Sequence, residues 1–190
     1  LRGALNIRQV DFTRANLIYA KLTNADLGGA ILKEANLSQS HLGGANLGLA
    51  NLEEAILKNA NLMGANLGGA NLKGADLEEA NLTNATFVKA YLINANLSKA
   101  DLRDSNLTRA NLESANLSIA KLNGANLTKA NLRGADLYGA NLTKANLKDA
   151  DFKKAFLRDA DLYGAKLSGA NFRGVNLRYT YNISQDQYYL

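Results

Sequence analysis

The sequence predicts an all-β solenoid, and three columns of residues repeating every five positions predict it. Leu or Phe occupies every position whose number ends in 2 or 7 across residues 12–177. Ala occupies every position ending in 0 or 5 across residues 15–170, except at Ser40 and Ser105. Positions ending in 1 or 6 are mostly Asn or Asp, and the other two positions of each pentad vary.

A period of five fits neither a helix nor a straight strand. At about 100° per residue, five steps would carry Leu around every side of a helix. In a strand, an odd spacing turns the side chain to the opposite face. Ala and the following Leu lie two residues apart, so they point the same way in an extended segment. The chain must then turn a corner before the next Ala, and repeated corners wind it into a solenoid with Ala and Leu inside.

The residue before each Ala is the predicted corner residue. A type II turn needs a positive φ at its third position, which Gly and Asn adopt most readily. Gly64, Gly69 and Asn84 are examples of this choice. Lys or Glu at other corners predicts that not every corner is a type II turn.

The composition excludes several classes of protein. The 190 residues contain no Cys and no Pro, so disulfides and thiolate metal sites are excluded. No apolar run approaches the ~20 residues that a membrane-spanning helix needs. Residues 1–95 hold eight basic and eight acidic side chains, whereas residues 96–190 hold fourteen and nine, so the C-terminal half carries the whole net charge of +5. This excess is far below that of dense basic arms, so a nucleic-acid partner is not favoured.

The A-(D/N)-L-x-x pattern, as in residues 60–64, resembles the pentapeptide-repeat family over about 166 residues. The resemblance implies a right-handed quadrilateral parallel β-helix with four pentads per coil, and the repeats would then make about 8.5 coils. We expect an irregular N-terminal segment at residues 1–9, the pentapeptide-repeat β-helix at 10–178, and a C-terminal cap or dimerisation tail at 179–190. Many relatives that the chain resembles are cyanobacterial.

No set of residues predicts catalysis. His41 has no nucleophile or carboxylate partner, and a lone His makes a poor general base. Ser40 and Ser105 are best interpreted as small residues of the inward column. The Asp residues of the outer column are spread over different sides, whereas a metal site needs converging carboxylates. We therefore expect no catalytic, cofactor-binding or metal-binding residue, and no enzyme activity.

Four pentads per coil predict a basic patch on the outer surface. Arg133, Lys153 and Arg173 fall in one column, one coil apart. The candidate patch for an anionic partner comprises Lys129, Arg133, Lys148, Lys153, Lys154 and Arg173. The alternative interpretation is an ordinary solvated face.

Apolar residues gather on another side of the same half. Ile119, Tyr138, Phe156 and Tyr179 fall there in successive coils, and Phe156 stands where Asn or Asp is normal. Exposed aromatic clusters often mark interfaces. The four residues form a candidate apolar interface for a partner or a homodimer through the C-terminal end, or a surface covered by the tail.

Three functions remain open. The first is a non-enzymatic protein-binding scaffold or regulatory module whose partner is unknown. The second is binding of an anionic partner, a nucleic acid or an acidic surface, through the basic patch. The third follows from the resemblance, because better-known relatives are acidic mimics of DNA that interact with DNA gyrase, but the net positive charge disfavours it. The chain begins with Leu, so targeting is not readable; the cytoplasm is weakly favoured, and the periplasm and thylakoid lumen stay open.

Overall fold

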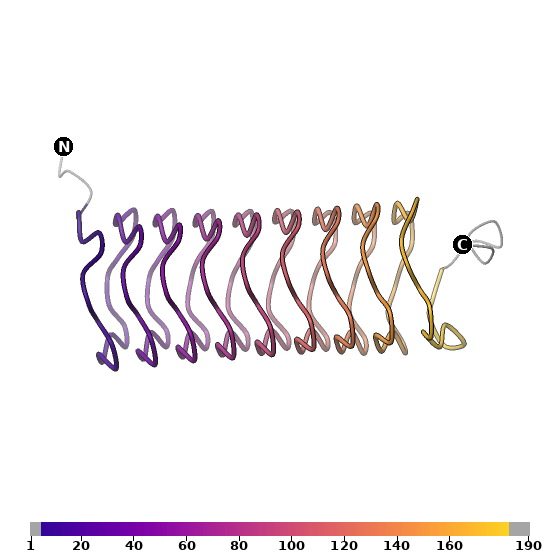
Figure 1. Cartoon of the computed structure of the whole chain (residues 1–190), viewed down its shortest axis with the longest axis horizontal. Helices are drawn as coiled ribbons and strands as arrows, with labels where there is room; N and C mark the ends of the chain where they lie inside the picture. The colour runs from indigo at the N-terminus through magenta and orange to yellow at the C-terminus, as the bar shows by residue number, and fades with distance from the viewer. Residues whose placement is uncertain (1–4, 183–190) are drawn as a thin grey trace.

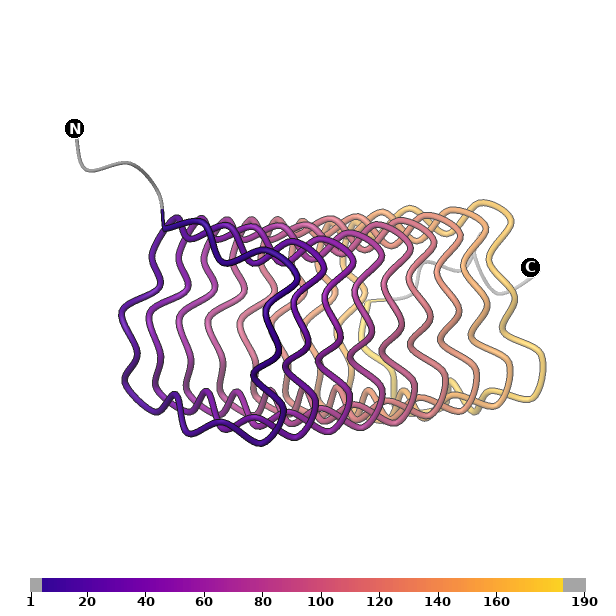
Figure 2. The same ribbon diagram turned by 60° about the vertical axis from the view of Figure 1, so that its left-hand side comes forward.

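The chain forms a rod of stacked coils, described for residues 5–182 by the computed structural model (Figure 1). The coils follow one another along the long axis, so chain order is also the order along the rod. Figure 2 shows the coils obliquely, each winding around a common interior. Across residues 5–182 the backbone forms no continuous helix or strand, but a regular series of isolated bridges.

Parallel bridges join each coil to the next and link residues 20 positions apart, as Asp26 with Asn46. The N–H of Leu27 donates to the carbonyl of Asn46 at 2.7 Å, and the N–H of Asn46 donates to the carbonyl of Ala25 at 2.9 Å. The same pair of bonds recurs at each bridge position of the regular coils. A bridge position occurs at every fifth residue, so each coil consists of four pentads and has four sides.

We name each side after its first bridge residue. The Asn6 side begins with residues 6–9, the Asp11 side with 11–14, the Asn16 side with 16–19 and the Lys21 side with 21–24, and each side recurs once in every coil. The sides follow one another in chain order. The Asp11 side therefore lies between the Asn6 and Asn16 sides and opposite the Lys21 side.

The interior holds the Leu/Phe and Ala columns, which confirms the predicted inward orientation. Every residue of both columns is buried across residues 22–170, and Phe87 and Phe152 have no exposed surface. Phe152 also stacks on Phe172 of the next coil, with ring centroids 4.9 Å apart and planes at 6°. Each coil thus buries four large side chains, each contributing about 1.5–3 kcal/mol, and it does so mainly against its two neighbouring coils.

All the corners of the regular coils adopt one turn, so the expectation that only some corners are type II turns was wrong. The Ala N–H donates to the Leu carbonyl three residues before it, as from Ala45 to Leu42 at 2.9 Å. The residue before Ala has a positive φ at every corner across residues 9–174, including 57° at Glu34 and 58° at Lys89. This conformation costs a non-Gly residue roughly 1–2 kcal/mol. Backbone bonds to the neighbouring coils impose it regardless of the side chain.

The Asn and Asp column supports each corner from outside. The Oδ1 of Asn36 accepts a hydrogen bond from the N–H of Ser38 at 3.0 Å, two residues along the chain. Side chains of this column also bond along the rod: Asn66 donates to Asn46, and Asn46 donates to Asp26, both at 2.9 Å. An amide supplies both bonds at once, which explains why Asn predominates there.

The two serines of the Ala column are equally buried but differently bonded. The Oγ of Ser105 donates to the carbonyl of Leu102 at 2.7 Å. The Oγ of Ser40 finds no hydrogen-bond partner within the described part of the chain. Because an unpaired buried hydroxyl costs free energy, Ser40 is a weak point of the interior.

Residues 5–9 follow the same coil geometry as the repeats after them. The N–H of Ile7 donates to the carbonyl of Asp26 at 2.9 Å, and Gln9 has a φ of 56°. Residues 1–4 of the expected N-terminal segment, and residues 183–190 of the expected tail, lie outside the described residues.

The last described coil departs from the repeat on the Asn16 side. Among the described residues no bridge joins Phe156 to Asn176. The N–H of Asp159 donates to the carbonyl of Tyr179 at 2.8 Å, one position later than the repeat would place its partner. Pairing resumes at Tyr181, whose N–H donates to the previous coil at 2.8 Å. The last coil therefore separates locally from its neighbour.

Candidate interaction surfaces

Residues with catalytic or metal-binding chemistry lie apart from one another. His41 is exposed on the Lys21 side, between Lys21 and Asn61 of the neighbouring coils. Ser40 and Ser105 are buried in the interior, out of reach of a substrate. Within residues 5–182, no three His, Asp or Glu side chains gather where they could hold a metal ion. The same residues include no helix long and apolar enough to cross a membrane.

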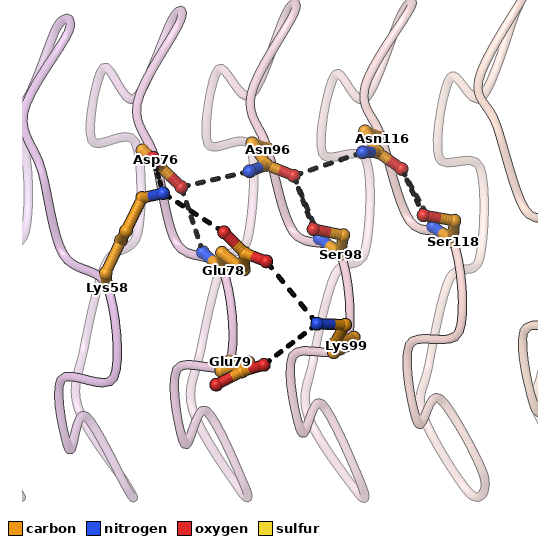
Figure 3. Close-up of polar contacts among 9 residues, drawn as sticks. All are labelled: Lys58, Asp76, Glu78, Glu79, Asn96, Ser98, Lys99, Asn116 and Ser118. Carbon is orange, nitrogen blue, oxygen red and sulfur yellow. Dashed lines mark hydrogen bonds and ion pairs between the residues drawn. The ribbon is translucent and has the colours of Figure 1, made fainter.

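A charged network occupies the middle of the Asn16 side (Figure 3). The Nζ of Lys58 lies 3.2 Å from Asp76 and 3.1 Å from Glu78. The Nζ of Lys99 lies 3.0 Å from Glu79 and 3.6 Å from Glu78. Two ammonium groups on the flanking coils thus contact three carboxylates of the coil between them.

The pairing within this network shifts the acid–base equilibria of its members. The hydrogen bond from Lys58 lowers the pKa of Glu78, and the bond to Glu79 raises the pKa of Lys99. The two Lys side chains remain about half exposed, and ion pairs in water contribute little. On the Asp11 side, Glu53 similarly lies 3.8 Å from Lys33 and 3.9 Å from Lys73. These four ammonium groups are therefore paired with carboxylates of the rod itself.

The predicted apolar residues lie together on the Asn16 side, further along the rod. Ile119 donates its N–H to the carbonyl of Tyr138 at 2.7 Å, and Phe156 pairs with Asp136. Ile119, Tyr138, Phe156 and Tyr179 are 53%, 45%, 65% and 53% exposed. We call these four residues the aromatic surface.

A pocket of about 470 Å³ opens where the last coil separates from the coil that carries Phe156. Its walls include the rings of Phe156 and Tyr179 and the side chain of Arg158. The guanidinium groups of Arg158 and Arg178 each lie 5.6 Å from the centre of the Tyr179 ring. Cations held near this aromatic ring make the rim of the pocket positive.

The predicted basic patch spans two sides of the rod. Arg133, Lys153 and Arg173 stack on the Asp11 side, where Lys154 is their neighbour, whereas Lys129 and Lys148 lie on the Asn6 side. A shallow depression of about 270 Å³ is lined by Glu113, Ser114, Arg133, Gly134, Lys153 and Lys154. Arg133 reaches Asp151 at 3.9 Å, the one ion pair formed by these six cations within residues 5–182.

Sequence reasoning missed Lys89, Arg109 and Tyr163, which extend these groups, whereas Tyr181 belongs to the expected C-terminal tail. Lys89 and Arg109 stack below Lys129 in the same corner column. Tyr163 and Tyr181, 61% and 59% exposed, carry the aromatic character onto the Lys21 side. The 20-residue spacing of Lys89, Arg109 and Lys129 in the sequence already indicates that they hold the same corner position in successive coils.

The geometry agrees with comparison to known proteins. The family model described as pentapeptide repeats matches in eight copies that together span residues 4–178. The chain belongs to the pentapeptide-repeat family. Members of this family fold as right-handed quadrilateral β-helices, in agreement with the four sides of each coil.

Several solved pentapeptide-repeat proteins are similar to this one. HetL of the cyanobacterium Nostoc sp. strain PCC 7120, involved in regulating heterocyst differentiation, is 34% identical, with 95% of this chain and 92% of HetL covered and a TM-score of 0.42. QnrB1, a plasmid-mediated fluoroquinolone resistance protein, is 22% identical over 91% of both chains, with a TM-score of 0.68. Rfr23 of the cyanobacterium Cyanothece 51142 is 30% identical over 62% of this chain and 64% of Rfr23, with a TM-score of 0.28. No curated protein gave a significant match.

Proposed function

We propose that this pentapeptide-repeat protein is a non-enzymatic scaffold or regulatory module that binds a partner protein through the aromatic surface. The exposure of Phe156 carries the proposal. It occupies a position where this repeat places a hydrogen-bonding Asn or Asp, and 65% of its surface faces solvent. Exposing a phenyl ring contributes nothing to the coil, so a contact outside the coil accounts for it better.

The pocket beside Phe156 supports a protein partner. Aromatic residues and Arg are enriched at the centres of protein interfaces, and here Phe156, Tyr179, Arg158 and Arg178 lie together. The rod holds these residues on a scaffold of backbone bonds and a packed interior. Over Ile119, Tyr138 and Phe156 a partner therefore meets a surface whose shape is set before binding, which lowers the entropic cost of association.

The partner is either another protein or a second copy of this chain. The aromatic surface extends to the C-terminal end of the described rod, where a homodimer would join two rods end to end. Mimicry of DNA toward gyrase fits less well, because it requires columns of negative charge and this half of the chain is positive.

The experiment replaces Phe156 with Asn, the residue that the repeat favours at this position. Ile56→Asn is the matched control, because Ile56 occupies the same column of the Asn16 side, is 37% exposed and lies several coils away from the aromatic surface. A photo-crosslinker placed at residue 138 should capture a defined partner, or a second copy, in wild type and in Ile56→Asn. Capture should be lost in Phe156→Asn while circular dichroism stays unchanged. Undiminished capture by Phe156→Asn would rule out the aromatic surface as the contact.

A further inference from the structure

A column of three cations follows the corner between the Asn6 and Asp11 sides. Lys89, Arg109 and Lys129 occupy this corner in successive coils: the N–H of Lys89 donates to Thr108 at 3.1 Å, and that of Arg109 donates to Thr128 at 2.9 Å. All three cations are exposed. Neighbouring strands of a sheet lie ~4.8 Å apart, so these like charges stand close together.

A second column of cations follows the opposite corner of the Asp11 side. The N–H of Gly134 donates to the carbonyl of Lys153 at 3.0 Å, and the N–H of Lys154 donates to the carbonyl of Arg173 at 3.1 Å. These bonds place Arg133, Lys153 and Arg173 one above another, with Lys154 beside them. This column begins in the coil in which the first column ends.

The two columns overlap in one coil and together form a stepped line from one corner of the Asp11 side to the other. Lys129 and Arg133 belong to the same coil and stand at the two corners of its Asp11 side. Three carboxylates border this line: Glu113 precedes Arg133 in the second column, Asp149 follows Lys129 in the first, and Asp151 lies 3.9 Å from Arg133. We call this stepped line the basic band, formed by Lys89, Arg109, Lys129, Arg133, Lys153, Lys154 and Arg173. It spans four coil steps, about 19 Å along the rod.

The rod does not neutralise the basic band. Within the described chain, the contact between Arg133 and Asp151 at 3.9 Å is its one ion pair. Lys99, at the equivalent corner position of the Asn16 side, instead contacts both Glu78 and Glu79. Stacked unpaired cations repel one another, so an anion that binds along the band relieves this repulsion and stabilises the folded rod.

We propose that the basic band binds the sugar–phosphate backbone of a single-stranded nucleic acid. A single narrow line of cations matches one phosphate chain, whereas a duplex presents two. Tyr91 lies on the Asp11 side two residues after Lys89, is 54% exposed, and offers a ring on which a base can stack. The net charge of +5 does not reveal this arrangement, because carboxylates elsewhere on the chain offset the cations of the band.

The test is fluorescence anisotropy with a labelled oligo-dT of about 20 nucleotides over a salt series. Seven phosphate contacts predict that the logarithm of the binding constant falls against the logarithm of the salt concentration with a slope of about −5, since each contact on a single strand contributes about −0.7. One variant carries Lys89→Gln, Arg109→Gln and Lys129→Gln; a second carries Arg133→Gln, Lys153→Gln and Arg173→Gln. Each should weaken binding by about tenfold or more and reduce the slope by about 2.

The matched control carries Lys21→Gln, Lys121→Gln and Lys144→Gln, three exposed cations of the opposite Lys21 side. It removes the same charge and should change affinity less than about twofold. Equal losses of affinity in all three variants would mean that binding depends on net charge alone, and would overturn the proposal. Failure of the wild-type protein to bind oligo-dT would also overturn it. So would tighter binding of a duplex of the same length.

Two single variants separate this site from its alternatives. Tyr91→Ala should weaken binding of oligo-dT and not of inorganic polyphosphate; equal weakening of both would exclude base stacking and a nucleic-acid-specific site. Tyr163→Ala should leave the oligonucleotide affinity unchanged, because Tyr163 lies on the opposite Lys21 side.

Discussion

The N-terminal and C-terminal parts of the rod share one interior and differ in how their surface charges are matched. Up to Arg103, most cations pair with carboxylates of nearby residues or neighbouring coils, as Arg14 with Glu34 at 2.6 Å. Beyond Arg103, the described chain forms two ion-pair contacts, between Arg133 and Asp151 at 3.9 Å and between Arg158 and Asp159 at 3.5 Å. Ion pairs within and between coils can therefore neutralise the charged surface of the rod. Where it leaves cations and aromatic rings unmatched, a partner is the physical explanation we favour.

Replacing Leu52 or Leu132 with Asp should produce the largest effect and tests the shared interior. Both side chains are fully buried, so each change buries an unpaired carboxylate and removes apolar contacts. We expect a loss above about 5 kcal/mol in the free energy of unfolding from either change. Chemical denaturation followed by circular dichroism measures it. A much milder effect in one half would show that the two interiors are not equivalent.

Exchanging the buried serines for Ala should give smaller effects of opposite sign. Ser40→Ala removes a hydroxyl with no partner in the described structure and should raise the free energy of unfolding by about 1–3 kcal/mol. Ser105→Ala removes a bond to Leu102 and should lower it by about 1 kcal/mol. The same denaturation curves report both changes, and shifts in the same direction would contradict the assigned bonding.

Lys99→Gln and Lys129→Gln sharpen the contrast in surface charge. Both residues occupy corners with a φ of 58°, so the free-energy cost of the backbone conformation is the same at both positions. Lys99→Gln removes contacts to two carboxylates and should lower the melting temperature slightly. Lys129→Gln relieves repulsion from Arg109 and should leave the melting temperature unchanged or raise it. Added salt should erase the difference, because it screens exposed charges; a difference that persists at high salt would have another cause.

The smallest expected effect is a pH dependence of the network in Figure 3. The hydrogen bond from Lys58 lowers the pKa of Glu78 below its ordinary value of 4.5. The resulting stabilisation is present above that ordinary pKa and is lost as the pH falls through the lower pKa of the folded state. Melting temperatures of wild type and Glu78→Gln should therefore differ near neutral pH and converge once the pH falls below the pKa of Glu78 in the folded state. Curves that stay parallel would exclude Glu78 as a contributor.

The sequence predicted the interior well and the corners poorly. Alternation of Leu and Ala identifies the inward residues because burial depends on side-chain chemistry. A positive φ at Glu34 or Lys89 follows instead from backbone bonds between coils, and no property of the Glu or Lys side chain signals it. The local preference of one residue is outweighed by hydrogen bonds to the coils on either side.

The candidate surfaces were predicted in part. Four pentads per coil place Arg133, Lys153 and Arg173 in one column and gather Phe156 with its aromatic neighbours. The same arithmetic places Lys89 and Arg109 in the column of Lys129, two coils and one coil earlier along the rod, respectively. The pocket beside Phe156 was not predicted, because the end of the repeat at Val175 and Thr180 signals an irregular last coil but not which backbone bonds change partner.

The uniform length of the coils also determines how this surface can change over generations. Insertion of a single pentad would rotate every downstream side chain by a quarter turn and would cut the basic band at the point of insertion. Duplication of a whole coil would instead slide the downstream surface along the axis and keep it on its side. Lineages can therefore lengthen the rod or move a binding surface along it by copying coils, without redesigning the interior.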